Sequence, residues 1–166
     1  MTNLYIDLEW FHNQKVFLVG WAYDLKNYGQ LYEETLTTNH LEKIFRKADG
    51  YLFFYGPDVA MLEKHFNIAI RQYCKCCNLI RVFKEALPGR YSYKLAELEK
   101  DYGIKRSTVE YKTNIFKIWH DWNNLELRKK ILTYNMEDVL NMLRLKKMIF
   151  NRQQISNKDI DQFLLK

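Results

Sequence analysis

Four carboxylates lie where the neighbouring residues favour a buried, apolar environment. Asp7 and Glu9 belong to the segment LYIDLEW, Asp58 to YGPDVAML, and Asp138 to YNMEDVLNMLRL. A buried carboxylate is costly unless it is paired or binds a cation. Converging acids with no matching basic residue in these segments predict a site for divalent metal ions, and an all-oxygen ligand set suits Mg²⁺ or Mn²⁺.

The first two acids are expected on one strand. Leu4, Ile6 and Leu8 alternate along residues 3–10, which is typical of a half-buried strand. Because successive strand side chains point to opposite faces, Asp7 and Glu9 would lie side by side.

Asp138 is expected on a long helix over about residues 125–150. Steps of three and four residues make it the only charged side chain on a stripe that also contains Leu127, Ile131, Tyr134, Met142, Leu145 and Ile149. Tyr134 lies one turn before Asp138, so the two would project the same way. Asp58 is expected in the first turn of a helix that follows the buried strand YLFFYG.

Each of these residues also has a simpler explanation. Asp58 could complement the helix dipole, and Asp138 could pair with Lys130 or Arg144. Asp7 and Glu9 could lie on a solvated strand face, and Tyr134 could be a core aromatic. A DxE strand, an acid that opens a helix and a late YxxxD helix, in this order, favour one joint site.

This ordered set resembles the DEDDy group, the 3′–5′ exonucleases of the RNase H-like superfamily that carry four acids and a tyrosine. Proofreading domains of DNA polymerases belong to this group. The segments RYSYKLAELEKDYGIKR and YNMEDVLNML are also similar to those of small RNase H-like exonuclease domains, and the likeness covers roughly residues 4–145. The middle motif is looser, because many relatives have Asn or Gly and then an aromatic residue before the acid, where this chain has FYGPD.

The resemblance implies an α/β, RNase H-like (ribonuclease H-like) fold, with a mixed central β-sheet flanked by helices. It implies a single exonuclease domain over residues 1–166, in which 151–166 form a C-terminal extension. The order of the sequence patterns agrees: three leading strands, a helix, a buried strand and further helices.

The resemblance also implies phosphodiester hydrolysis with two Mg²⁺ or Mn²⁺ ions. Asp7 would bridge both ions, Glu9 and Asp138 would complete the shell of the first, and Asp58 would hold the second. The Tyr134 hydroxyl would orient the attacking water. The partner would be the 3′ end of a single-stranded nucleic acid, with DNA favoured over RNA.

Residues for substrate binding are expected next to the first strand and on basic segments. Trp10, Phe11 and His12 follow the DxE pair and could stack on terminal bases, or could close the end of the core. Further candidates for contacts to the backbone are basic: Lys105, Arg106, Lys112, Arg128, Lys129, Lys130, Arg144, Lys146 and Lys147.

The remaining elements are expected as follows. Strands cover residues 15–24, 30–36 and 51–56, and helices cover about 38–48 (capped by Thr38), 57–70, 92–103 (capped by Ser92), 115–122 and part of 156–166. Residues 78–86 are compatible with strand or helix. Cys74, Cys76 and Cys77 are expected as reduced, half-buried helix positions, with a metal role beside His65 as the alternative.

Composition agrees with a globular protein that binds a polyanion. The chain of 166 residues is 48% hydrophobic and carries a net charge of +6, so basic residues must crowd outside the acidic site. There is no run long enough for a membrane helix and no signal-like start, so a cytoplasmic protein is expected.

Two other functions compete with the exonuclease. One is a catalytically inactive RNase H-like module that binds nucleic acid or a protein, and the intact set of acids argues against it. The other is an endonuclease of the ribonuclease H or resolvase type, whose second acid generally comes from a helix and not from a DxE strand.

Overall fold

The strand that carries Asp7 and Glu9 occupies the middle of a mixed five-stranded sheet. The structure is a computed structural model that describes residues 1–111 and 114–165. The strands are β1 (Leu4–Trp10), β2 (Val16–Ala22), β3 (Tyr28–Tyr32), β4 (Tyr51–Phe54) and β5 (Lys75–Asn78), in the spatial order β3-β2-β1-β4-β5. β1 is antiparallel to β2 and parallel to β4. The expected α/β class with a mixed sheet is confirmed.

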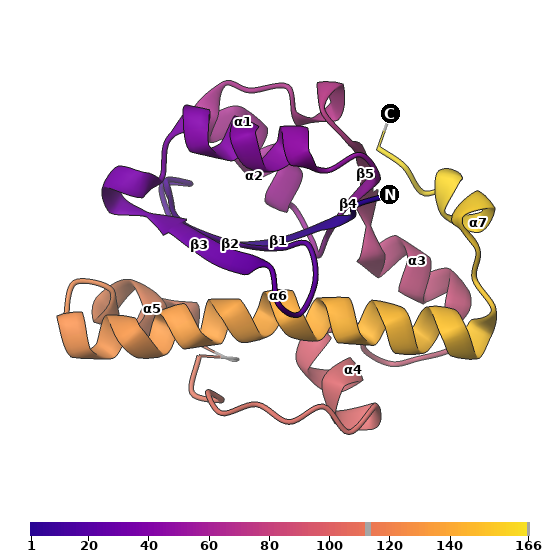
Figure 1. The fold of residues 1–166 in the computed structure, drawn as a ribbon. Coiled ribbons are helices and arrows are strands. Elements are labelled where there is room, and N and C mark those ends of the chain that lie inside the picture. Colours follow the sequence, from indigo (N-terminus) through magenta and orange to yellow (C-terminus); the bar gives the residue numbers. More distant parts are fainter. Residues whose placement is uncertain (112–113, 166) are drawn as a thin grey trace.

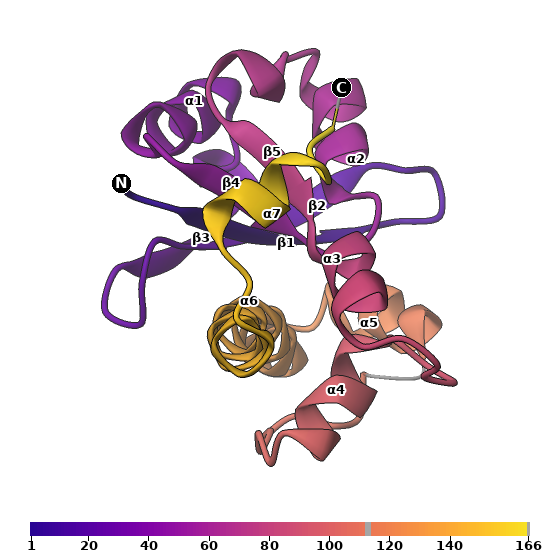
Figure 2. The same ribbon diagram turned by 90° about the vertical axis from the view of Figure 1, so that its right-hand side faces the viewer.

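Helices cover both faces of the sheet (Figure 1). The helices α1 (Thr38–Lys47) and α2 (Asp58–Phe66) lie on one face. The 29-residue helix α6 (Leu125–Gln153) crosses the other face, which it shares with α3 (Leu79–Ala86), α4 (Leu95–Asp101) and α5 (Ile115–Asp121) (Figure 2). A last helix, α7 (Asn157–Asp161), follows α6.

The alternation along β1 decides which face receives the acids. Leu4, Ile6 and Leu8 are buried in the core beneath α1 and α2, whereas Tyr5 belongs to the core that packs against α6. Side chains two residues apart share a face. Asp7 and Glu9 therefore point towards α6.

The predicted stripe of α6 is confirmed. Ile131, Met142, Leu145 and Ile149 are buried on the same helix as Asp138. The helix begins where the Asn124 side chain accepts hydrogen bonds from the N–H groups of residues 126 and 127.

Several predicted boundaries and caps were wrong for local reasons. The cap of α1 is Thr37, whose side chain accepts from the His40 N–H group, and not Thr38. Ser92 caps no helix, because α4 begins only at Leu95. The third strand covers Tyr28–Tyr32 and ends where Glu33 adopts a positive φ of 49° and opens a short 3₁₀ turn. The ambiguous segment 78–86 is helical from Leu79.

The cysteines lie on and before a strand, so their helical prediction was wrong. Cys76 and Cys77 belong to β5, Cys74 precedes it, and all three thiols are buried and free. A four-residue strand is too short to show a pattern, and pairing with β4 defines it. In the described part of the chain, no cysteine joins a group of side chains able to hold a metal.

The C-terminal residues cover the outer edge of β5. The Leu165 N–H group donates to the Cys76 carbonyl oxygen at 2.9 Å, and Leu164 forms a bridge with Cys77. Within the described residues, no helix is both long and apolar enough to cross a bilayer.

Candidate functional site: an acidic cluster between strand β1 and helix α6

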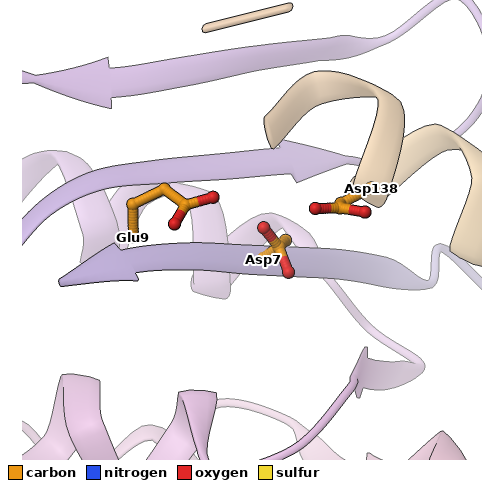
Figure 3. Close-up of side chains that lie close together, drawn as sticks. All are labelled: Asp7, Glu9 and Asp138. Atoms are coloured by element: carbon orange, nitrogen blue, oxygen red, sulfur yellow. The ribbon is translucent and has the colours of Figure 1, made fainter. Parts of the chain in front are cut away.

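Three of the four predicted acids converge where α6 crosses the centre of the sheet. Carboxylate oxygens of Asp7, Glu9 and Asp138 lie within 4.8 Å of one another. Figure 3 shows the three side chains, two from the strand and one from the helix, gathered around a common point. Glu9 and Asp138 are buried, and Asp7 is half-buried.

Asp58 lies beside this cluster but outside the group of three. It is buried at the start of α2, directly after β4, and its carboxylate accepts a hydrogen bond from the Tyr55 N–H group at 3.3 Å. Its negative charge nevertheless acts on both Asp7 and Glu9. Asp58 therefore holds the turn before its helix and also adds charge to the site.

The acids raise one another's pKa values. Burial and then the charges of Asp138, Asp58 and Glu9 hold the pKa of Asp7 well above its usual range. Burial and the charges of Asp138 and Asp58 do the same to the pKa of Glu9. Burial raises the pKa of Asp138 to about 6, although Arg106 and Tyr134 act in the opposite direction.

Repulsion of this kind is relieved by protonation or by a cation. Three carboxylates with oxygens so close together match the hard oxygen ligands that Mg²⁺ and Mn²⁺ prefer. The donor set therefore fits a divalent metal, with Asp7, Glu9 and Asp138 able to hold it and Asp58 next to them.

Asp138 has a basic partner that its spacing does not reveal. The Arg106 guanidinium donates from Nη2 to the Asp138 carboxylate, and both side chains are almost fully buried. The predicted partners of Asp138 were wrong: Lys130 pairs with Glu110 at 3.3 Å, and Arg144 donates to the Asn141 side chain at 2.6 Å. The actual partner, Arg106, lies outside the three segments that contain the acids.

Asn135 is a second polar residue of the site that received no role from the sequence. Its Nδ2 donates to the Asp7 carboxylate at 2.9 Å and to the Asp7 carbonyl oxygen at 3.3 Å. Gln30 on β3 donates to Asn135 Oδ1 at 2.9 Å, which fixes the amide orientation. The signal was present, since Asn135 stands beside Tyr134 in the YN motif on the buried side of the helix.

Tyr134 lines the same cavity as Asp7 and Asp138. Burial and the charges of Asp138, Glu9 and Asp7 raise the pKa of its hydroxyl far above the ordinary value. The phenol therefore stays protonated at neutral pH and can donate a hydrogen bond, but it is a poor base.

The cavity extends from the acids to the loop before α4. It has a volume of about 820 Å³ and is lined by Asp7, Trp10, Tyr55, Ile80, Lys84, Tyr91, Ser92, Tyr93, Lys94, Leu95, Ala96, Arg106, Tyr134 and Asp138. The Tyr91 side chain is fully exposed at its rim. Lys84 and Lys94 are exposed and form no ion pair with another described residue. Sequence reasoning missed all three, because nothing in their spacing links them to the acids.

The predicted stacking residues divide between cavity and core. Trp10 follows a β-bulge after Glu9 and lines the cavity. Phe11 packs on Phe17 with ring centroids 4.3 Å apart, and His12 lies 5.4 Å from the Trp119 ring, so neither lines the cavity.

Among the basic candidates for backbone contacts, Arg106 is buried and already paired. Arg128 pairs with Glu33. Lys112 lies outside the described residues.

Solved structures of similar fold include polymerase and nuclease chains. A family B DNA polymerase from the hyperthermophilic archaeon Pyrobaculum calidifontis superposes with a TM-score of 0.69 at 13% identity over 90% of this chain, which spans 24% of the polymerase chain. Brucella melitensis NrnC gives a TM-score of 0.66 at 17% identity, covering 98% of this chain and 80% of its own. A structure described as the apo form of the nuclease gives 0.67 at 14% identity, covering 97% of this chain and 77% of its own. At these identities the likeness concerns the fold.

A comparison with curated proteins finds no match. The RNase_H_2 family model, described as RNase_H superfamily, matches residues 4–150, which include β1, α2, most of α6 and all four acids. This chain is therefore a member of the RNase H superfamily, with the RNase H-like fold that its motifs predicted.

Proposed function

We propose that this protein is a metal-dependent 3′–5′ exonuclease of the DEDDy type that acts on single-stranded nucleic acid, with DNA favoured over RNA. The observation that carries the proposal is the convergence of Asp7, Glu9 and Asp138 within 4.8 Å, beside a cavity that Asp7 and Asp138 line together with Tyr134. One of the Brucella NrnC structures of similar fold contains bound Mg²⁺.

The acids would hold two Mg²⁺ or Mn²⁺ ions, with Asp7 shared between them and Asp58 beside the second. Ions in such a pair activate water and stabilise both the attacking and the leaving oxygen of the phosphodiester. The Asn135 amide orients the Asp7 carboxylate for this task. The Tyr134 phenol keeps its proton, so it orients the attacking water as a hydrogen-bond donor and does not deprotonate it.

The rest of the cavity suits an unpaired polynucleotide end. Trp10 and Tyr91 offer aromatic faces on which bases can stack, and stacking accepts every base. Lys84 and Lys94 lack acidic partners among the described residues, so their charges are free to meet backbone phosphates.

Single-stranded DNA and RNA with a 5′ label test the proposal. We expect a ladder that shortens from the 3′ end with Mg²⁺ or Mn²⁺, and no cleavage with EDTA. Asp7→Asn should abolish cleavage, because it removes one ligand charge while an oxygen remains to accept from Asn135. Glu34→Gln is the matched control, since it makes the same chemical change on an exposed residue.

The competing functions give different results. A circular single strand is opened only by an endonuclease, so its cleavage would replace the exonuclease proposal. Binding of single strands without cleavage under any metal condition would support the inactive module instead.

A further inference from the structure

We propose that Arg106 is a positioning residue of the metal site, whose buried guanidinium fixes Asp138 and Tyr134 in the arrangement that holds the ions. This inference rests on the proposed function. It concerns a residue that follows α4 and lies 32 positions before Asp138 in the sequence.

The guanidinium forms a fork between two acids. Its Nε donates to Glu99 Oε2 at 2.5 Å and its Nη2 donates to Glu99 Oε1 at 2.6 Å. The same Nη2 donates to Asp138 Oδ1, so one guanidinium nitrogen contacts both acids. The side chains of Arg106 and Glu99 are 2% and 1% exposed, so these bonds are shielded from water.

Glu99 is itself fixed to the helix that carries Asp138. The Asn141 side chain donates to Glu99 Oε1 at 3.0 Å, and Arg144 donates to Asn141. Asn141 lies three residues after Asp138 on α6, so the chain of contacts leaves α6, passes through α4 and returns to α6 at the acid. Such a closed network leaves the Asp138 carboxylate little freedom to rotate.

The remaining side of the guanidinium faces the tyrosine. The Arg106 Cζ atom lies 5.3 Å from the centroid of the Tyr134 ring. Its Nη1 is buried and has no hydrogen-bond partner among the described residues. One side chain therefore contacts both of the α6 residues that the proposed chemistry needs.

A purely structural role is the alternative, in which the Arg106–Glu99 pair only joins α4 to α6. The two explanations predict different metal affinities for the double variant Glu99→Met/Arg106→Met. It removes one charge of each sign, so the net charge near the acids is unchanged. Replacing a buried ion pair by apolar side chains is often neutral for stability, whereas removing one partner alone is damaging.

For a positioning role, we expect this double variant to fold while its Mg²⁺ or Mn²⁺ dissociation constant rises about ten- to a hundredfold, as is typical for loss of groups that orient metal ligands. Calorimetric titration with each metal alone measures this without substrate. Arg106→Lys keeps the charge but loses the fork, so we expect a smaller rise in the same direction.

Leu41→Ala is the control for a general loss of stability. Leu41 is a buried residue of α1, which covers the opposite face of the sheet. This variant should melt at a lower temperature and bind the metal as the wild type does.

Wild-type metal affinity in the folded double variant, or in Arg106→Lys, would overturn the positioning role. If the wild type binds the metal but cleaves no nucleic acid, the proposed function fails and the calorimetry still decides the role of Arg106. A wild type that binds neither ion at millimolar concentration would overturn both.

Discussion

At the scale of single residues, the acids of the site are held together against their mutual repulsion. Asp7, Glu9 and Asp138 share one small volume, and the pKa of each is raised. A group whose pKa is higher in the folded state than in the unfolded state opposes folding once the pH exceeds its unfolded value. In the metal-free protein, the charged forms of these carboxyl groups should therefore lower the free energy of unfolding at neutral pH, relative to a lower pH at which the groups are protonated.

Asp7→Asn should stabilise the metal-free protein in a pH-dependent manner. Near pH 8 we expect a gain of about 1 to 3 kcal/mol in the free energy of unfolding, because the variant has no charge to bury. The gain should shrink as the pH falls through the raised pKa values, of which that of Asp138 is about 6, and should vanish near the unfolded value of about 4. Urea unfolding in EDTA at several pH values measures it, and a gain independent of pH would contradict the repulsion.

Tyr134→Phe should slow cleavage without weakening metal binding. The change keeps the ring that contacts Arg106 and removes only the hydroxyl. Loss of one positioned hydrogen bond in a transition state typically costs about ten- to a thousandfold in rate. Single-turnover kinetics at saturating Mg²⁺ measures the loss, and a wild-type rate would show that Tyr134 is a packing residue only.

The residues of the site differ in how far the sequence reveals them. The sequence alone identifies four site residues, because each breaks or continues a periodic pattern within its own segment: Asp7, Glu9, Tyr134 and Asp138. The sequence does not identify Glu99 and Arg106 as site residues, because each has the pattern of an ordinary charged surface residue and is buried only in the folded structure. The partner of a buried charge is determined by tertiary contacts between distant segments.

At the scale of elements, the site depends on how closely α6 approaches β1 and β2. Gly20 on β2 lies directly opposite Asp7. A Cβ atom at this position would lie 2.4 Å from Asn135 Oδ1 and 2.8 Å from Val139 Cγ2. The missing side chain leaves the space through which Asn135 reaches Asp7.

Gly20→Ala should therefore displace α6 and impair catalysis. We expect a loss of about 1 to 3 kcal/mol in stability from overpacking and a fall in rate of at least about tenfold, since small misplacements at a site are costly. Gly29→Ala is the control, because the atoms nearest to its Cβ would belong to the Trp21 ring, the first at 2.8 Å, and not to α6. An equal fall in rate for the control variant would contradict a local effect on Asp7.

The elements themselves were predictable where a pattern runs for a full strand or helix. β1, β2, β4, α1, α5 and α6 were expected close to their observed positions. β5 was not, because its four residues are defined by pairing with β4. The cap of α1 was misplaced by one residue, because Thr37 and Thr38 could serve equally well. The cap of α4 was misplaced because its N-cap is Lys94, which forms no side-chain capping hydrogen bond.

At the scale of the whole molecule, the net charge of the chain is opposite in sign to the charge of its candidate site. The chain carries a net charge of +6 although its candidate site is a cluster of acids. Lys84 and Lys94 line the cavity to which Asp7 and Asp138 also contribute.

Lys84→Ala/Lys94→Ala should weaken binding of a single strand more than it slows cleavage. Two lost phosphate contacts should raise KM several-fold and lower the dependence of affinity on log salt by roughly 1 to 2 units. Lys43→Ala, on the exposed side of α1, is the control. An unchanged salt dependence in the double variant would exclude these lysines from the path of the substrate.

The pairing of Leu164 and Leu165 with β5 has a consequence for solubility. An uncovered edge strand presents free N–H and C=O groups on which another chain can extend the sheet. In this molecule the last residues of the chain occupy part of that edge. A chain shortened after Gln153 would lose this cover together with the buried Ile160, and we expect it to self-associate in a concentration-dependent manner, as light scattering would show. The C-terminal tail thus protects the fold against growth of its own sheet.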